Sequence, residues 1–460
     1  MLTLLLWHLW QNQTSDETSD ANPNRQAALP CPLGNSIMKL DREWKWLTLL
    51  VIIRILVLVL CVGADFFLSD HEADGVEIAQ VTFSSQWSQA LLSPFIKWDG
   101  AHYINISVNG YKRAQHLVFL PFLPYLLKAA STLRLPFFNP IEISIIFALL
   151  WNIFASAVCL IVLRRILLDK LKYNTERVTL ACYCYVFNPA TIFFTTLYTE
   201  SSYCMFTFCA LAYLGESTLF SCLCLLFASF TRSNGAWNAI IVGGYFAQEA
   251  YRLWLNNTCK DDSHKGGWVA FFWCALQGLC AVLCSICPAI LWQVVSWMRL
   301  CNGAKPLEPD YCAMCSRNRL AVHSPYSFLQ GKYWSVGFLS FYQPKQLPNF
   351  LLGLPICLYA LRIVYIHCKH YFKGQSMSYI LMQPSLPYVL HLVVLLVTLL
   401  GWAHMQISTR VLCSASPLVY LALAEELQSE YAIRKYFVLL FLVVYGIDGA
   451  IAHVNFYPWT

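Results

Sequence analysis

The amino-acid sequence predicts an all-α protein that crosses a membrane several times. Of its 460 residues, 58% are hydrophobic and only 12% are charged, whereas soluble domains carry about a quarter charged residues. Apolar runs of about 18 to 22 residues, long enough for a helix to span a bilayer, recur along the whole chain. The net charge of +6 is spread over many loops and forms no basic block, which argues against nucleic-acid binding.

The N-terminal segment carries no sign of a packed structure. Residues 1–10 are apolar but short, and they lack the basic region and the cleavage site of a signal peptide. Residues 11–36 are polar and rich in Pro, Asn and Ser. We therefore expect a disordered cytosolic tail over 1–36 and a single integral-membrane domain over 37–460.

The apolar runs predict about 8–11 transmembrane helices. The candidate spans are 46–64, 142–163, 178–197, 201–215, 217–231, 236–248, 268–298, 347–366, 385–404, 411–424 and 436–453. The segment 117–130 is different, because Pro121 and Pro124 interrupt its first half. This segment is predicted to be a re-entrant or interfacial helix that does not cross.

The distribution of charge predicts the orientation in the membrane. The residues Lys39, Arg42 and Lys45 precede the first span, whereas Asp65, Asp70, Glu72, Asp74 and Glu77 follow it. The positive-inside rule then places the N-terminus and the basic turn 164–177 in the cytosol, and the loops 65–141 and 299–346 in the lumen. Of the glycosylation sequons at Asn12, Asn105 and Asn256, only Asn105 is luminal in this topology.

Most of the twenty cysteines lie inside apolar runs, where Cys behaves as a small hydrophobic residue. Cys312 and Cys315 form a CxxC pair in a polar loop, so they are predicted to be a loop disulfide or free thiols. A metal site would require further ligands nearby, and none is evident. We therefore predict no metal centre.

Asp99 is the first candidate for chemistry, because it lies in the first luminal loop beside Trp98. If 97–108 is helical, Asp99, His102 and Tyr103 share one face at positions i, i+3 and i+4. A carboxylate among aromatic rings suits sugar binding and general-base catalysis on a hydroxyl group. The alternative is that Trp98 and Asp99 only anchor an interfacial helix at the membrane edge.

Glu200 and two arginines lie at the predicted edges of other spans. An acidic residue at membrane depth is costly and tends to be functional. The alternative for Glu200 is a solvated residue beside a helix N-cap formed by Thr199 or Ser201. Arg232 and Arg410 each suit a phosphate contact. The alternative for both arginines is contact with lipid headgroups.

The loop 299–346 ends in an aromatic stretch that contains Lys332 and Trp334. Such a stretch suits a lid or a sugar platform, or else an interfacial helix packed on lipid. The sequence contains no HExxH, P-loop, DxD or GxSxG motif, which argues against zinc proteolysis, nucleotide hydrolysis and serine hydrolysis.

Seven segments of the chain, in order, resemble the PIG-V family of endoplasmic-reticulum mannosyltransferases. They are WDGAHYINISVNGY, FLPFLP, FNPATIFFTTLYTES, FTRSNG, PYSFLQGKYWSVGFLSFYQPKQLPNFLL, STRVLCSASPLVY and NFYPWT. The resemblance covers residues from about 94 to 460. Where the family has an acidic residue before its FFPxFP segment, this chain has AQHLVFLPFLP, which puts the role of His116 in question.

The resemblance implies a GT-C architecture, a helical membrane enzyme whose site lies at the luminal face. It implies that the donor is dolichyl-phosphate-mannose and that no cofactor is needed. The acceptor would be the mono-mannosylated glucosaminyl-phosphatidylinositol precursor of GPI anchors, which receives a second, α1,6-linked mannose. The product would form by a single inverting displacement.

For such a reaction Asp99 is the expected base, by its position in the first luminal loop, and Glu200 is expected either to position the acceptor or to serve as a second catalytic acid. The leaving phosphate is expected to bind Arg410 first, with Arg232 and Lys332 as further candidates. The other expected substrate-binding residues are Trp98, His102, Tyr103, His116 and Trp334.

Three other readings remain open. The chain is alternatively a related transferase that uses another dolichyl-phosphate sugar or lipid acceptor. A multipass transporter is disfavoured because no internal repeat is present. A non-catalytic scaffold subunit is the third reading, and no signal in the sequence identifies a small membrane partner.

Overall fold

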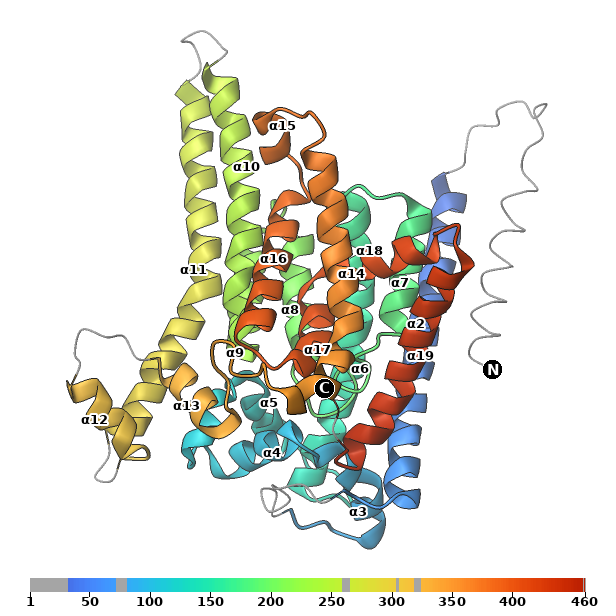
Figure 1. Ribbon diagram of the computed structural model, residues 1–460, viewed down its shortest axis with the longest axis vertical. Helices are drawn as coiled ribbons and strands as arrows, with labels where there is room; N and C mark the ends of the chain where they lie inside the picture. Colours follow the sequence, from blue (N-terminus) through green and yellow to red (C-terminus); the bar gives the residue numbers. More distant parts are fainter. Residues whose placement is uncertain are drawn as a thin grey trace.

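The computed structural model describes residues 32–71, 81–258, 265–302, 306–317, 324–457 and 459. Within these ranges every regular element is a helix and there is no strand. The long helices run side by side in one bundle, with short helices gathered at one end (Figure 1). The prediction of an all-α fold is confirmed.

The long helices are α2 (Pro32–Phe67), α6 (Pro140–Arg165), α10 (Asn238–Thr258), α11 (Lys265–Cys301), α14 (Leu347–Tyr371) and α19 (Ala432–Val454). Shorter helices complete the bundle: α7 (Thr175–Val186), α8 (Glu200–Ala212), α9 (Thr218–Thr231), α16 (Leu386–Gly401), α17 (Ser408–Ala415) and α18 (Pro417–Leu427). Because α2 begins at Pro32, its first turn lies inside the predicted tail; residues 1–31 lie outside the described ranges.

Among the described residues, five helices are long and apolar enough to cross a membrane by length and composition. They are Trp44–Phe67, Pro140–Lys170, Gly267–Cys301, Pro344–Tyr371 and Ala432–Val454. A pair bent by 96°, Met405–Ala415 with Pro417–Leu427, would be a sixth span. The other predicted spans are shorter or less apolar helices of the same bundle. Helix α8, for example, is buried along nearly its whole length, so protein surrounds it.

One predicted span is not a helix throughout. Helix α7 ends at Val186, and the following stretch 187–199 forms turns instead of completing the predicted span 178–197. Two adjacent residues explain the break, since Pro189 has no N–H donor and the Asn188 side chain accepts a 2.8 Å hydrogen bond from the backbone N–H of Ala190. The whole stretch is buried in the bundle.

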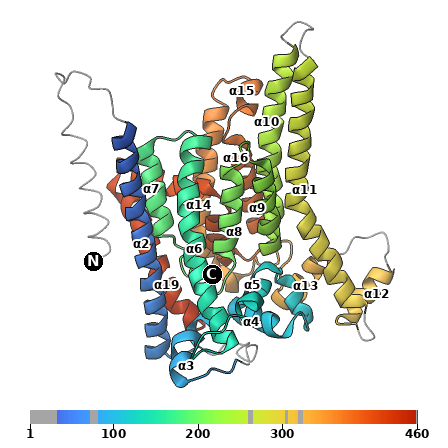
Figure 2. The same ribbon diagram turned by 180° about the vertical axis from the view of Figure 1, so that it is seen from behind.

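The two predicted luminal loops lie at the same end of the bundle (Figures 1 and 2). Loop 65–141 folds into α3 (Gln86–Leu92), α4 (Asp99–Asn109) and α5 (Phe122–Ala130), and loop 299–346 into α12 (Pro309–Arg317) and α13 (Pro325–Trp334). Helix α5 has 9 residues and is too short to cross, as predicted for 117–130. The opposite end carries α15 (Met377–Leu381), the last turn of α10 and the first turn of α11.

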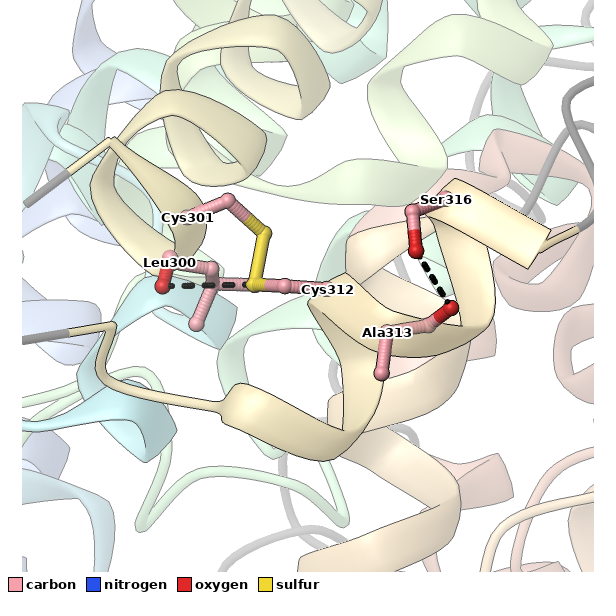
Figure 3. The surroundings of a disulfide bond; sticks show 5 residues. All are labelled: Leu300, Cys301, Cys312, Ala313 and Ser316. Carbon is pink, nitrogen blue, oxygen red and sulfur yellow. Dashed lines mark hydrogen bonds between the residues drawn. A yellow bond between two sulfur atoms is a disulfide. The ribbon is translucent and has the colours of Figure 1, made fainter.

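The cysteine prediction is wrong in one respect. Cys312 forms a disulfide with Cys301, not with Cys315, and this bond ties α12 to the end of α11 (Figure 3). Cys315 is a free thiol. Because Cys312 is already bonded to Cys301, it cannot also pair with Cys315.

Candidate active site

Asp99 is the first residue of α4, and its position is fixed by the residues on both sides of it. Trp98 has a φ of 53°, a strained conformation for a residue other than glycine. Its indole N–H donates to the carbonyl of His453 at 2.9 Å, and its ring lies 5.5 Å from that of Phe456. A Cβ on Gly100 would lie 3.0 Å from the backbone oxygen of Phe95, so a larger residue here would have to displace that backbone by a few tenths of an ångström. The end of α19 therefore holds the turn that presents Asp99.

Four charged side chains of alternating sign meet at this end of the bundle. Arg410 donates to Asp99 Oδ2 at 3.0 Å, and its Nε lies 3.8 Å from Glu200 Oε1. Glu200 also forms an ion pair with Arg232, which reaches Thr199 Oγ1 at 3.2 Å. The four residues come from α4, α8, α17 and the end of α9, so the fold brings together positions that are far apart in the sequence.

The two carboxylates differ in their access to solvent. The Asp99 side chain is 31% exposed, whereas the Glu200 side chain is 0% exposed. Glu200 is neither solvated nor beside a side-chain N-cap, because Thr199 makes no capping hydrogen bond. The alternative proposed for Glu200 is therefore wrong.

The guanidinium group of Arg410 rests on two aromatic rings. It lies 5.2 Å from the ring of Phe193 and 5.7 Å from the ring of Tyr198. Its buried Nε, like Glu200 Oε2, has no hydrogen-bond partner among the described residues. The charged cluster therefore contains two buried polar atoms that the described residues leave unsatisfied.

A second cluster contains the predicted residues His102, Tyr103, His116 and Trp334. The ring of His102 stacks on Phe119 at 4.7 Å, and the rings of His116 and Trp334 lie 5.7 Å and 6.4 Å from it. Tyr103 packs edge-on against Phe119 at 5.2 Å. These contacts bring α13 against α4.

Burial sets the protonation state of the two histidines. It lowers the pKa of His102 and lowers the pKa of His116 to about 4. Burial likewise raises the pKa of Tyr103. The two rings are therefore neutral at pH 7, and each offers one N–H donor and one acceptor nitrogen.

Lys332 is the predicted residue that does not join the charged cluster. It forms an ion pair with the buried Glu308, which also accepts a 2.7 Å hydrogen bond from the hydroxyl of Tyr333. The charge of Lys332 is thereby neutralised within its own loop. Glu308 had not been singled out from the sequence, where it is one acidic residue in a polar loop.

Some residues of the site were not predicted from the sequence, although signals for some of them were present. Phe193 lies in the FNPATIFFTTLYTES segment, inside the predicted span 178–197; Tyr198 follows that span, and Thr199 was considered only as a helix N-cap. His453 contributes only a backbone carbonyl, which no sequence pattern marks. Among the described residues, no group of three or more His, Cys, Asp or Glu side chains could hold a metal ion.

A family model described as Mannosyltransferase (PIG-V) matches residues 43–460. GPI mannosyltransferase 2 of Drosophila melanogaster is 26% identical, with 88% of this chain and 97% of the relative covered. GPI alpha-1,6-mannosyltransferase 2 is 24% identical in Mus musculus and 23% in Homo sapiens, each with 88% and 96% covered.

Solved structures with a similar helical arrangement include the archaeal oligosaccharyltransferase AglB from Archaeoglobus fulgidus, in complex with an inhibitory peptide and a dolichol-phosphate. The match has a TM-score of 0.45 and 11% sequence identity, and it covers 91% of this chain and 56% of the oligosaccharyltransferase chain. Because the family model covers nearly the whole described bundle, the chain belongs to the mannosyltransferase (PIG-V) family.

Proposed function

We propose that this protein transfers the second mannose, through an α1,6 link, onto the mono-mannosylated glucosaminyl-phosphatidylinositol precursor of GPI anchors. The donor is dolichyl-phosphate-mannose, and the reaction takes place at the luminal face of the endoplasmic-reticulum membrane. The names of the full-length relatives support the reaction. The observation that carries the proposal is the part-exposed Asp99 carboxylate, paired with Arg410 at one end of the membrane bundle.

The bond change requires one inverting displacement. The mannose of the donor is β-linked to phosphate and becomes α-linked in the product, so the acceptor oxygen attacks the anomeric carbon from the opposite face. As that bond forms, the bond from the anomeric carbon to the phosphate oxygen breaks, and dolichyl phosphate leaves with the electron pair. The proton of the acceptor hydroxyl goes to the base.

We assign the base to Asp99. One of its oxygens accepts the hydrogen bond from Arg410, and the partial exposure of the side chain leaves room for an acceptor hydroxyl at the other. Glu200 has no exposed surface, so a sugar hydroxyl cannot reach it. Its contribution is to hold Arg232 and Arg410 beside one another.

The leaving phosphate suits the two arginines. They are the two cations of the charged cluster, at the end of the bundle where a lipid-borne phosphate arrives. Arg410 is the first choice because it also touches the base. Lys332 is a weaker candidate because it lies outside the charged cluster, where it pairs with Glu308.

The aromatic cluster suits the sugar rings. Trp98 is 40% exposed and offers a ring face beside the base. His102, Tyr103 and Trp334 form the wall next to it, and the fully buried His116 supports His102 from behind. Neutral histidines can exchange hydrogen bonds with sugar hydroxyls.

The luminal location of this end is supported by the Cys301–Cys312 disulfide, which lies at the same end of the bundle as Asp99. Structural disulfides persist in oxidising compartments such as the lumen of the endoplasmic reticulum. Asn105 is half-buried in α4, whereas Asn256 is exposed at the opposite end; Asn12 lies outside the described residues. A glycan on Asn256 would contradict this orientation.

The proposal is tested by the lipid precursors of cells that lack the protein. We expect the one-mannose precursor to accumulate, and we expect re-expression of the full chain to restore the two-mannose product. Microsomes from the rescued cells should use dolichyl-phosphate-mannose and not dolichyl-phosphate-glucose. Normal GPI precursors in the deficient cells would overturn the proposed reaction, and use of the glucose donor would favour the related transferase.

A further inference from the structure

The segment 187–199 is an irregular piece of backbone deep inside a membrane bundle. Such backbone is tolerated in a membrane only where the protein itself satisfies the free N–H and C=O groups. Side chains of α6 do this here. Asn152 Nδ2 donates to the carbonyls of Thr196 and, at 3.3 Å, Tyr198, while Ser156 Oγ lies 3.4 Å from the carbonyl of Phe194.

A buried arginine reaches the same segment from α2. Arg54 lies in the middle of the candidate span Trp44–Phe67, is 0% exposed, and donates from Nη1 to Thr191 Oγ1. Its Nε and Nη2 have no hydrogen-bond partner among the described residues, and within those residues it makes no ion pair. A cation at this depth is costly to retain and commonly marks a function.

The segment that Arg54 holds carries the floor of the candidate active site. Phe193 lies two residues after Thr191, and its ring supports the guanidinium group of Arg410. The segment ends where Glu200 begins α8 and approaches the Nε of the same arginine. Thr191 is thus close in sequence to the residues that place Arg410 next to Asp99.

We propose that Arg54 is a positioning residue for mannose transfer, which acts through Thr191 on the segment that supports Arg410 and presents Glu200. This role rests on the proposed function above. Arg54 touches no substrate, because it is buried within α2, α7 and α18. Small displacements of catalytic groups reduce turnover strongly, so loss of this one contact is expected to lower kcat.

The contrasting possibility is that Arg54 only stabilises the bundle. A stabilising role would lower the amount and the melting temperature of the protein but leave the kcat of each folded molecule unchanged. A positioning role changes kcat in molecules that are fully folded. The substitutions at Arg54 also distinguish the two roles. Lysine can still donate to Thr191, so a positioning role predicts that Arg54→Lys keeps most of the wild-type kcat. Glutamine removes the charge and is shorter, so Arg54→Gln should lose kcat.

The experiment compares Arg54→Gln, Arg54→Lys and Thr191→Val in the full-length protein, with kcat and donor KM measured per folded molecule. We expect Arg54→Gln and Thr191→Val each to lower kcat about tenfold, with donor KM raised no more than about threefold. Arg54→Lys should recover most of the lost turnover. The double variant Arg54→Gln/Thr191→Val should be no worse than Arg54→Gln, because both changes remove the same hydrogen bond.

His391→Leu is the matched control, since His391 of α16 is also fully buried and its ring nitrogens have no partner among the described residues. Its kcat should equal that of the wild type. If the Arg54→Gln protein does not accumulate in the membrane, the kcat of Thr191→Val is the deciding measurement, because this substitution removes only one hydroxyl group and keeps the side-chain shape.

A wild-type kcat in Thr191→Val, or no recovery of kcat in Arg54→Lys, would overturn the positioning role. Failure of the wild type to transfer mannose would instead overturn the proposed function.

Discussion

Asp99 and Glu200 carry the same functional group, each is the first residue of its helix, and both approach Arg410, yet their surroundings differ. Asp99 follows a strained turn at the edge of the bundle and is partly exposed. Glu200 follows a buried segment, contacts two arginines and is fully buried. Access to solvent therefore separates a carboxylate that can exchange a proton with a substrate from one that fixes the positions of cations.

The two carboxylates are also held by different parts of the chain. The turn before Asp99 is clamped by the C-terminal end of α19, through the His453 carbonyl and Phe456. Glu200 is held from inside, by the segment that contacts α6 and Arg54. Changes at the clamp are expected to affect chemistry with little loss of folded protein, and changes around Glu200 to affect both.

The largest effect is expected for Asp99→Asn, which keeps the shape of the side chain and removes its basicity. Loss of a general base should lower kcat about a thousandfold, or about 4 kcal/mol in transition-state free energy. Radiolabelled mannose transfer in microsomes measures this, with protein amount determined in parallel. Asp310→Asn, which changes an acidic residue of α12 at the same end, should remain active. Transfer by Asp99→Asn within tenfold of the wild type would remove Asp99 from the chemistry.

Glu200→Gln is expected to act first on stability. The change removes the charge of a fully buried carboxylate that two half-buried arginines share, which should cost roughly 3 kcal/mol in the free energy of unfolding. A lower melting temperature and a lower amount of protein in the membrane would show this. Glu216→Gln is the control, because Glu216 pairs with Arg165 and Lys170 at an exposed position and should cost less than about 1 kcal/mol. Equal melting temperatures for the two variants would contradict the assignment.

Arg410→Lys tests the residue that contacts both carboxylates. Lysine keeps the charge but cannot direct separate N–H groups at Asp99, Glu200 and a phosphate. We expect kcat/KM for the donor to fall about thirtyfold, or about 2 kcal/mol. Arg434→Lys is the control, because Arg434 pairs with Glu426, and it should leave kcat/KM for the donor unchanged. An unchanged donor kcat/KM in Arg410→Lys would make Arg410 a structural residue.

The smallest effect is expected for Trp98→Phe, which removes the indole N–H that binds the His453 carbonyl. A single neutral hydrogen bond contributes about 1 kcal/mol, so kcat should fall about fivefold while the amount of protein stays normal. Trp87→Phe serves as the control, because Trp87 of α3 is 81% exposed. Loss of protein in Trp98→Phe without a lower kcat would show that the clamp supports folding alone.

The fold class followed from hydropathy, because long apolar runs have few ways to fold in a membrane. The break at 187–199 was missed although Asn188 and Pro189 signal it, since the apolar stretch after them resembles a span. The pairing of Cys301 with Cys312 was missed because Cys301 ends an apolar helix and the CxxC spacing drew attention to Cys315.

The site was predictable residue by residue but not as an arrangement. Asp99 was singled out in the first luminal loop beside Trp98, and Glu200, Arg232 and Arg410 as charged residues at the edges of predicted spans. The contact between Asp99 and Arg410 joins residues 311 positions apart, and no periodicity encodes such a contact. Burial of Glu200, the pairing of Lys332 with Glu308 and the reach of Arg54 depend on how helices pack, which requires the structure.

The most direct test measures mannose transfer per folded molecule for Asp99→Asn and Glu200→Gln side by side, at saturating donor. We predict that Asp99→Asn melts like the wild type and is about a thousandfold slower, whereas Glu200→Gln melts lower and stays within about thirtyfold of the wild-type rate. The reverse order, with folded Glu200→Gln inactive and Asp99→Asn active, would contradict the assignment of the base.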